Sequence, residues 1–528
     1  MRLFLFVFLA VLFTGCAKRG FISGGFKDTI PPVLKISEPK NYSTNFDSKE
    51  IKLYFDEYIK LKDVNKQLIV SPLMKNAPTI SPSSASKTII IKINDTLIPN
   101  TTYSLNFGKS IQDNNEGNPY QQFKYVFSTG SYIDSLTVVG SIKDAFNPKP
   151  DNFVSVQLYE YNEKFYDSII YKENPRYVTN TLDSASNFTL ENLKAGKYIL
   201  VALKDNNSNY KFDPKNDKIG FFSEPITVPD NTFYEMELFQ EEIPFKAVRA
   251  TQASGNKIII GHEGKPKNVA VKLFNGTSEI QTKITPVQGK DSLNVWFPMQ
   301  KVDSLKLEVT SANYEKDFVV KLKNMKVDTL SIGLSPTGNL HFRDTLALKT
   351  STPLSKWDST KMQLRKKDSL DVPFTTNYNA EKNLLHILFT KEERENYSFN
   401  LVPEALTDMF EKSNDSLAFK FSTRSQSDYG NLTLKINGVK SYPIIIQLTD
   451  NKGKTLAQSY AVNADAVTFE SLQPNQFTVR IIYDDNKNGI WDTGSYLEKR
   501  QTEEVFYYST PIEVRSNWDV EQTINVGG

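Results

Sequence analysis

Tyr103-Ser-Leu-Asn-Phe107 alternates apolar and polar residues, and the pattern returns in the second half of the chain as Tyr397-Ser-Phe-Asn-Leu401. Alternation with a period of two predicts a strand that has one buried face. In both places a Phe-Ser-Thr triplet begins 24 residues after the tyrosine, at Phe127 and at Phe421. Two related segments that keep this spacing indicate a repeated domain.

A second repeat follows each copy of the first. Leu190-Glu-Asn-Leu193 corresponds to Phe469-Glu-Ser-Leu472, and Pro225-Ile-Thr-Val228 corresponds to Pro511-Ile-Glu-Val514. The repeats divide the chain into a signal segment, a tether and five units, which are 1–15, 16–27, A (28–130), B (131–241), C (242–334), A′ (335–426) and B′ (427–528).

The pattern along all five units predicts an all-β protein. Alternating runs such as Leu305–Val309 and Leu432–Ile436 are separated by Asn, Asp, Gly, Pro and Ser, and convincing helical periodicity is nearly absent. Each unit is about the size of one immunoglobulin-like sandwich. We therefore expect tandem immunoglobulin-like β-sandwiches that form a rod.

The composition argues against several classes of function. The 528 residues include 63 Lys and Arg against 61 Asp and Glu. The net charge of only +2 gives little electrostatic attraction for nucleic acid. One cysteine and three histidines exclude a disulfide framework and a Cys-rich zinc site. The histidines, His262, His341 and His386, lie in different units or strands, so we expect no His-based catalysis and no enzyme activity.

The N-terminus predicts a lipid anchor. Leu3–Phe13 is apolar but too short to span a bilayer, and the only cysteine, Cys16, follows the small pair Thr14-Gly15. This arrangement resembles a bacterial lipoprotein signal, in which the cysteine is acylated and becomes N-terminal. The alternative is an ordinary secretory signal with an incidental cysteine. The lipoproteins that this segment resembles reach the outer membrane when no Asp follows the cysteine, and here Ala17 follows. The sequence does not decide between the periplasmic and the surface leaflet of that membrane.

Unit A carries the motifs of a known domain family. Gly24–Pro32, Phe55-Asp-Glu57, Leu97–Tyr103 and Asp113–Asn118 resemble the SbsA-type bacterial Ig-like domain, and more narrowly the Ig-like-domain lipoproteins of Bacteroidota. Unit A′ is a degenerate second copy, because Met409-Phe-Glu411 replaces the Asp-x-x-Gly turn. Units B and B′ are similar to prealbumin-like β-sandwiches. The resemblance implies a non-catalytic envelope or cell-surface protein and names no substrate.

Two loops place side-chain oxygens at alternating positions, as calcium loops do. Gly489 supplies the sharp turn in the second loop, whereas Tyr210 stands there in the first. Neither loop has the usual Glu at position twelve, for which Asp217 or Glu498 are the substitutes. The alternative is an Asx-rich turn that caps its own backbone. The predicted ligands of a structural calcium ion are Asp205, Asn207, Asn209, Asp213 and Asp217 in unit B, and Asp484, Asn486, Asn488, the Ile490 carbonyl and Asp492 in unit B′.

Asp-Ser or Asp-Thr followed by an apolar residue is unusually frequent in this chain. The triplet resembles the O-glycosylation acceptor motif of Bacteroidota envelope proteins, and the alternative is a turn exit before a strand. The predicted acceptors are Thr29, Thr96, Ser135, Ser168, Ser184, Ser292, Ser304, Thr329, Thr345, Ser369 and Ser416.

These features favour a non-catalytic, lipid-anchored envelope protein. We expect a structural or interaction subunit that serves an outer-membrane assembly for protein insertion, secretion or import, with membrane and envelope proteins as partners. The alternatives are a glycan-binding or adhesive surface protein and, third, a glycan-acting enzyme. No cofactor other than structural calcium is expected.

Overall fold

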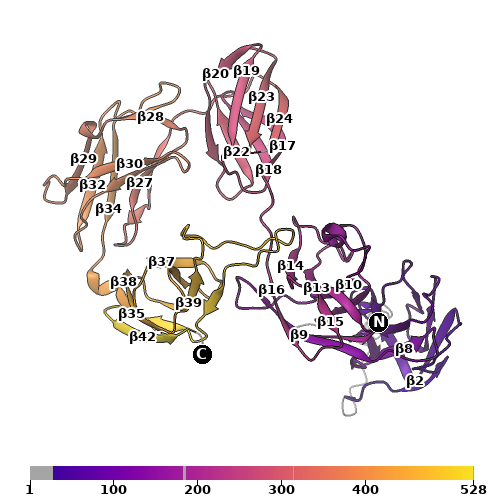
Figure 1. The fold of residues 1–528 in the computed structure, drawn as a ribbon. Helices are drawn as coiled ribbons and strands as arrows, with labels where there is room; N and C mark the ends of the chain where they lie inside the picture. The colour runs from indigo at the N-terminus through magenta and orange to yellow at the C-terminus, as the bar shows by residue number, and fades with distance from the viewer. Residues whose placement is uncertain (1–27, 182–185, 313, 527–528) are drawn as a thin grey trace, which may run out of the picture.

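The computed structural model describes residues 28–181, 186–312 and 314–526 as an all-β protein of tandem Ig-like β-sandwiches (Figure 1). This confirms the predicted fold class. The helical segments of the described part are short turns, namely α2 (Val64–Gln67), η1 (Asp167–Tyr171), η2 (Ser359–Lys361) and η3 (Gln426–Asp428). Cys16 and Ser184 lie outside the described residues, so their predicted roles stay predictions.

Units A and A′ have the same strand arrangement. The strands of A are β1 (Leu34–Glu38), β2 (Glu50–Leu61), β3 (Ile69–Ser71), β4 (Thr79–Ser81), β5 (Ser86–Lys92), β6 (Thr102–Asn106), β7 (Ile111–Asp113) and β8 (Lys124–Ser128). The strands of A′ are β25 (Ile332–Ser335), β26 (Gly338–Asn339), β27 (Leu346–Thr350), β28 (Leu354–Trp357), β29 (Met362–Lys366), β30 (Thr375–Asn379), β31 (Leu384–Leu388), β32 (Asn396–Leu401), β33 (Leu406–Asp408) and β34 (Leu417–Ser422). The order β1-β2-β5-β4 in A corresponds to β25-β27-β31-β30 in A′, and β3-β6-β8 corresponds to β29-β32-β34.

The repeated tyrosine occupies the same place in both units. Tyr103 stacks on Phe127 with ring centroids 5.4 Å apart, and Tyr397 stacks on Phe421 at 5.1 Å. Each tyrosine hydroxyl also accepts a hydrogen bond from a backbone N–H five residues earlier, at 3.0 Å and 2.9 Å. The spacing in the sequence therefore reflects one buried aromatic pair that joins the ends of two neighbouring strands.

Units B and B′ match each other strand for strand. The strands of B are β9 (Leu136–Asp144), β10 (Ser155–Glu160), β11 (Tyr177–Asn180), β12 (Asn187–Leu193), β13 (Gly196–Lys204), β14 (Lys218–Phe221), β15 (Ile226–Val228) and β16 (Phe233–Leu238). The strands of B′ are β35 (Gly430–Asn437), β36 (Ile444–Thr449), β37 (Thr455–Ala461), β38 (Ala466–Leu472), β39 (Asn475–Tyr483), β40 (Val505–Tyr507), β41 (Ile512–Val514) and β42 (Asp519–Asn525). Each unit has a five-stranded and a three-stranded sheet. The five-stranded sheet has the order β11-β10-β13-β14 or β37-β36-β39-β40, with β15 or β41 also paired to β13 or β39, and the three-stranded sheet has the order β12-β9-β16 or β38-β35-β42.

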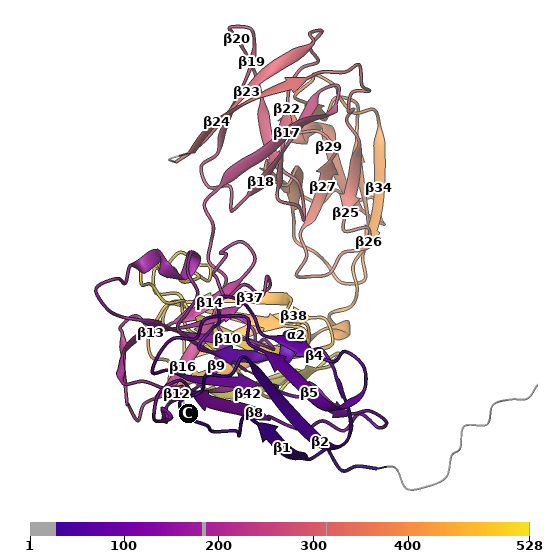
Figure 2. The ribbon, with the colours of Figure 1, turned by 90° about the vertical axis from the view of Figure 1, so that its right-hand side faces the viewer.

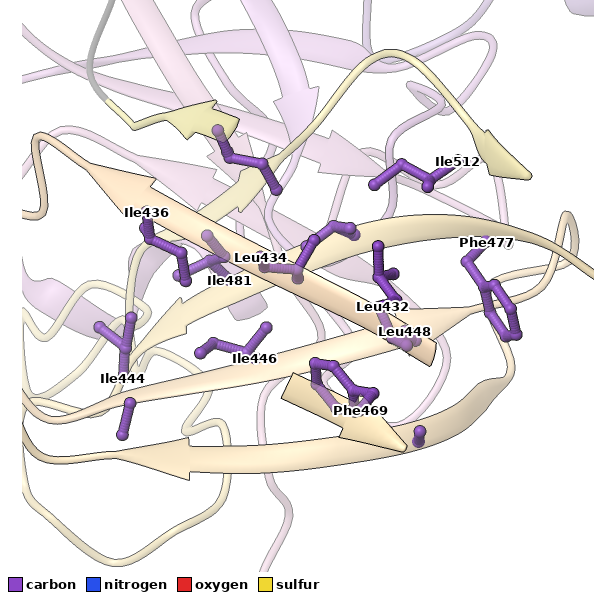
Figure 3. Packing of buried hydrophobic residues seen from close by; sticks show 14 of the residues in the cluster. Leu432, Leu434, Ile436, Ile444, Ile446, Leu448, Phe469, Phe477, Ile481 and Ile512 are labelled. Atoms are coloured by element: carbon purple, nitrogen blue, oxygen red, sulfur yellow. The ribbon is translucent and has the colours of Figure 1, made fainter. Parts of the chain in front are cut away.

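The core of each sandwich lies between its two sheets. In B′, Leu434 comes from β35 and faces Ile446 and Ile481 from β36 and β39, and all three side chains are buried (Figure 3). Alternating strands place one set of side chains in this layer and the other set outside it. The predicted two-residue periodicity therefore accounts for the buried face.

Unit C is a sandwich of two four-stranded sheets. Its strands are β17 (Lys246–Ser254), β18 (Lys257–Glu263), β19 (Ala270–Asn275), β20 (Ser278–Ile280), β21 (Lys283–Pro286), β22 (Ser292–Trp296), β23 (Ser304–Ser311) and β24 (Tyr314–Lys321). The sheets have the orders β17-β18-β22-β21 and β20-β19-β23-β24. The boundary expected at residue 334 is too late, because β25 pairs with β27 and belongs to A′.

The expected rod is wrong. Units C and A′ lie together at one end of the molecule, and the chain turns back so that B′ lies beside B (Figure 1, Figure 2). A long loop between β39 and β40 reaches across and buries Tyr496 among side chains of B. Units B, C, A′ and B′ therefore form a closed ring, and A is attached to B outside it.

No helix in the described ranges is long and apolar enough to cross a membrane.

Candidate functional site

The two Asx-rich loops follow equivalent strands of B and B′. Asp205 begins the first loop and accepts hydrogen bonds from two backbone N–H groups of its own loop, at 3.1 and 2.7 Å. Asp484 begins the second and accepts two in the same way, at 3.0 and 2.8 Å. Each opening aspartate therefore acts as a turn-forming acceptor, which was the alternative to calcium binding.

The loop of B′ brings most of its predicted ligands together. Asp492 Oδ2 accepts hydrogen bonds from the side-chain amides of Asn486 at 2.7 Å and Asn488 at 2.6 Å. Calcium is bound by amide oxygens, so both amides would have to turn their oxygens toward the ion. The Ile490 side chain is exposed. This geometry is compatible both with a calcium site and with an Asx-rich turn that caps its own backbone.

The loop of B is less compact around its predicted ligands. Asn207 and Asn209 are exposed, and Asn209 Oδ1 accepts from a backbone N–H two residues on at 2.8 Å. Asp213 instead accepts from the side chain of Asn216, at 2.7 Å. Nowhere in the described residues do three Asp, Glu, His or Cys side chains form a group that could hold a metal ion. Calcium at either loop stays a prediction.

A buried carboxylate closes the base of each loop. Asp217 accepts from two backbone N–H groups of the first loop, at 2.9 and 3.0 Å. Glu503 does the same in the second loop, at 2.9 Å to Asp485 N and 2.9 Å to Asp492 N. Burial raises the pKa of both carboxyls above the ordinary value, and neighbouring carboxylates raise it further.

Glu503 was missed by sequence reasoning, which suggested Glu498 instead. Glu498 is exposed and pairs with Arg500 at 3.3 Å, outside the base of the loop. The signal was present in the repeat itself: from Asp205 to Pro225 is 20 residues, whereas the corresponding interval in B′ is 27. The seven extra residues shift the closing carboxylate along the chain.

These extra residues carry the contact between B′ and B. Tyr496 is fully buried in a cluster of B that includes Phe221, Phe212 and Phe239. Its ring meets Phe221 edge-on, with centroids 5.2 Å apart and an interplanar angle of 87°. Burial of the Tyr496 ring stabilises this contact, and its hydroxyl, which is buried without a hydrogen-bond partner, offsets part of that stabilisation. The seven-residue insertion is therefore a docking element.

Polar groups fix the docked loop in one register. The backbone N–H of Tyr496 donates to Glu241, and Gln501 Nε2 donates to the backbone oxygen of Phe221 at 2.9 Å. Burial raises the pKa of Glu241, and the backbone N–H of Tyr496 opposes this shift. Gly494 fits here because a Cβ would lie 2.5 Å from the Phe239 ring. The contact therefore needs both the small residue and the buried tyrosine.

A second contact between B′ and B lies beside the docked loop. The guanidinium of Arg480, which is 3% exposed, lies 4.0 Å from the ring centroid of Phe146 in B. Its Nε donates to Gln447 at 2.7 Å, and the Trp491 ring lies 4.6 Å from that of Phe146. Tyr507 donates its hydroxyl hydrogen to the backbone oxygen of Phe146. Stacked cations in a desolvated site contribute about 2 kcal/mol.

An open pocket of about 1050 Å³ lies where B, C and B′ meet. Asp213 lines it from B, Asn486 and Asp492 line it from B′, and Tyr314 lines it from C. Both Asx-rich loops therefore contribute residues to one space.

The predicted glycosylation residues are accessible to solvent wherever they are described. Ser168 and Ser292 are half-buried, and the others are exposed, namely Thr29, Thr96, Ser135, Ser304, Thr329, Thr345, Ser369 and Ser416. Several precede or begin a strand, such as Ser135 before β9 and Ser304 at the start of β23. The structure is therefore compatible with both interpretations of the triplets, as O-glycosylation acceptors and as turn exits before a strand.

The three histidines are separate. His262 Nδ1 lies 2.9 Å from the backbone oxygen of Gly264, and His341 Nδ1 lies 2.8 Å from the Tyr429 hydroxyl at the joint between A′ and B′. His386 is half-buried in β31. The first two rings therefore have local partners, whereas His386 Nδ1 is buried without a hydrogen-bond partner.

The comparisons with known proteins support the domain type. The family model of a bacterial Ig-like domain matches residues 28–129, which is nearly all of unit A. The chain contains a bacterial Ig-like domain. No curated protein matches the chain.

Solved structures resemble the chain only distantly. Domains 1–6 of surface layer protein SbsC share 11% identity over 92% of this chain and 67% of that chain, with a TM-score of 0.16. The titin domains z1z2 in complex with telethonin share 14% identity over 35% of this chain and 93% of theirs, with a TM-score of 0.13. Scores this low give no information on function.

Proposed function

We propose that the chain is a non-catalytic envelope protein, anchored by acylation of Cys16 to the outer membrane, and a structural or interaction subunit of an outer-membrane assembly. The assembly is one for protein insertion, secretion or import. The observation that supports this proposal is the docking of the B′ loop on B, which holds four sandwiches in one arrangement.

A fixed ring suits a scaffold because it keeps several loop surfaces at constant distances. Sandwiches joined only by linkers would reorient freely, and a partner would then lose binding energy in ordering them. The joints between neighbouring units also carry direct contacts, such as Lys124 with Glu191 between A and B, at 2.5 Å, and Lys215 with Glu263 between B and C, at 2.7 Å. The two or three acyl chains of a lipoprotein would place this ring at a membrane surface.

Affinity purification of the tagged chain from detergent-solubilised membranes tests the proposal. We expect a stoichiometric envelope partner that is lost with Tyr496→Asp, which opens the ring, and kept with Tyr166→Asp, a change at an exposed tyrosine. A chain that purifies alone, or a partner retained by the open ring, contradicts the scaffold role. Fatty-acid labelling that persists in Cys16→Ser contradicts the anchor.

A further inference from the structure

A groove runs along the junction of units A and B. Its larger part has a volume of about 720 Å³, and an adjoining hollow of about 510 Å³ shares Leu73, Lys75 and Asn174 with it. Ligand pockets typically have volumes of several hundred cubic ångströms and often lie at domain interfaces. The continuous groove suits a short oligomer better than a compact molecule.

Direct contacts between A and B form this groove in advance. The backbone N–H of Val178 in β11 donates to Ser71 Oγ in β3 at 3.1 Å, and the Thr102 hydroxyl donates to the buried Asp134 at 2.8 Å. Because the two walls are held by these bonds, a ligand would not have to order them.

The walls combine apolar rings with hydrogen-bonding groups. Phe153 and Tyr210 both line the groove and both have positive backbone φ angles, 54° and 59°. Non-glycine residues held in this region are strained, and such residues cluster at ligand sites. The amide oxygen of Asn180, also in the lining, is buried and accepts no hydrogen bond. A hydroxyl group brought by a ligand would satisfy it after a small rotation of the amide.

The charge of the groove is positive. Lys66, Lys75 and Lys204 line the larger part, against the single carboxylate of Asp205, which already accepts two backbone N–H groups. Among the described residues neither Lys66 nor Lys75 forms an ion pair, and both are exposed. The groove therefore offers free ammonium groups to an anion.

In the adjoining hollow the acidic side chains have partners. Glu160 pairs with Arg176 at 3.4 Å, and Glu173 accepts a hydrogen bond from the Tyr166 hydroxyl at 2.8 Å. Arg176 balances the charge of Glu160, whereas Glu173 keeps its negative charge, so the anionic groups of a ligand are expected at the lysines of the larger part.

We propose that the groove between A and B binds an acidic oligosaccharide, a hydroxylated chain that carries carboxylate or sulfate groups. The rings of Phe153 and Tyr210 offer apolar faces to sugar rings, Asn180 accepts from a sugar hydroxyl, and Lys66 and Lys75 bind the anionic groups. This binding goes beyond the scaffold role, because it is argued from the junction of A and B, whereas the scaffold role is argued from the contact of B′ with B.

Calorimetric titration of the full chain carrying Cys16→Ser tests the proposal. The probes are tetragalacturonate and a sulfated tetrasaccharide, with maltotetraose as a neutral control and tetraglutamate as an acidic peptide. We expect at least one anionic saccharide to bind, with an affinity that falls as salt rises. Lys66→Gln with Lys75→Gln should weaken binding at least about tenfold, because the double variant removes both free ammonium groups that pair with the anionic groups of the saccharide.

Matched variants separate the groove from general charge. Lys382→Gln with Lys412→Gln removes two exposed lysines of A′ and should leave the affinity unchanged. Tyr210→Asn keeps a residue type that tolerates positive φ, removes the ring, and should weaken saccharide binding. No binding of either anionic saccharide, equal binding of maltotetraose or tetraglutamate, or indifference to the two groove lysines would overturn the proposal.

Discussion

Tyr496 of the last sandwich packs edge-on against Phe221 of the second sandwich, with ring centroids 5.2 Å apart. The contact joins segments that are far apart in the sequence, and it turns a row of β-sandwiches into a ring. Tyr496 is fully buried there although it lies in a loop of its own unit. The inserted segment therefore holds the last sandwich against the second, together with the contact of Arg480 and Tyr507 with Phe146.

Truncation of the buried tyrosine should open the ring. We expect Tyr496→Ala to lose about 3 kcal/mol of docking free energy, because it leaves a cavity among the aromatic side chains of B. Small-angle scattering should show a larger radius of gyration. Tyr166→Ala, at an exposed tyrosine of B, should leave it unchanged; equal effects of the two variants would refute the docking role.

Gly494→Ala should weaken the same contact without removing any buried group. The added Cβ would lie 2.5 Å from the Phe239 ring and 2.8 Å from the backbone oxygen of Arg500, and that backbone cannot easily move. We expect faster proteolysis within the loop. Gly453→Ala is a suitable comparison for steric effects, because its Cβ meets nothing within 4 Å, although its φ of 80° adds local strain.

The docked loop should be more stable at acidic pH. Burial raises the pKa of Glu241 above its ordinary value of 4.5, so the docked form binds a proton more readily than the undocked form. The stabilisation that Glu241 gives to the docked loop is therefore complete below pH 4.5, and it is lost as the pH rises through the raised pKa. Glu241→Gln should flatten this dependence and stabilise the loop at neutral pH, as measured by thermal unfolding. A steeper loss in the variant would show that the sign is wrong.

Calcium should raise the melting temperature if the B′ loop binds it. A ligand at a hundredfold excess over Kd adds about 2.7 kcal/mol, and Asp484→Ala should abolish the increase. Asp450→Ala is the control, because Asp450 accepts two backbone N–H groups at 2.9 Å in an exposed turn of the same unit. Identical melting in calcium and in chelator would leave these residues as turn formers.

The sandwiches could be predicted from the sequence because their signals are local. Alternation in Tyr103–Phe107 fixes which side chains are buried, and the 24-residue spacing reflects one aromatic pair that recurs as Tyr397 with Phe421. The boundary between C and A′ was placed too late because β25 is short and carries no repeat motif. Local patterns thus define sheets well and their junctions less well.

The docking could not be predicted, because burial of Tyr496 depends on another unit. Within B′ the inserted loop has no strand periodicity, and its apolar residues look like those of any surface loop. The longer interval from Asp484 to Pro511 indicates an insertion but does not identify its partner. Glu503 was missed for the same reason, since the insertion moved it away from the expected position.

The distance between the docked loop and unit B tests the central claim most directly. Spin labels on cysteines introduced at Ser168 and Glu498 flank the ion pair of Asp167 with Lys499, whose charged atoms lie 3.0 Å apart. In a chain that also carries Cys16→Ser, double electron–electron resonance should give one narrow distribution at the short end of the measurable range. Adding Tyr496→Asp should broaden it toward long distances. A broad distribution before that change would contradict the closed ring.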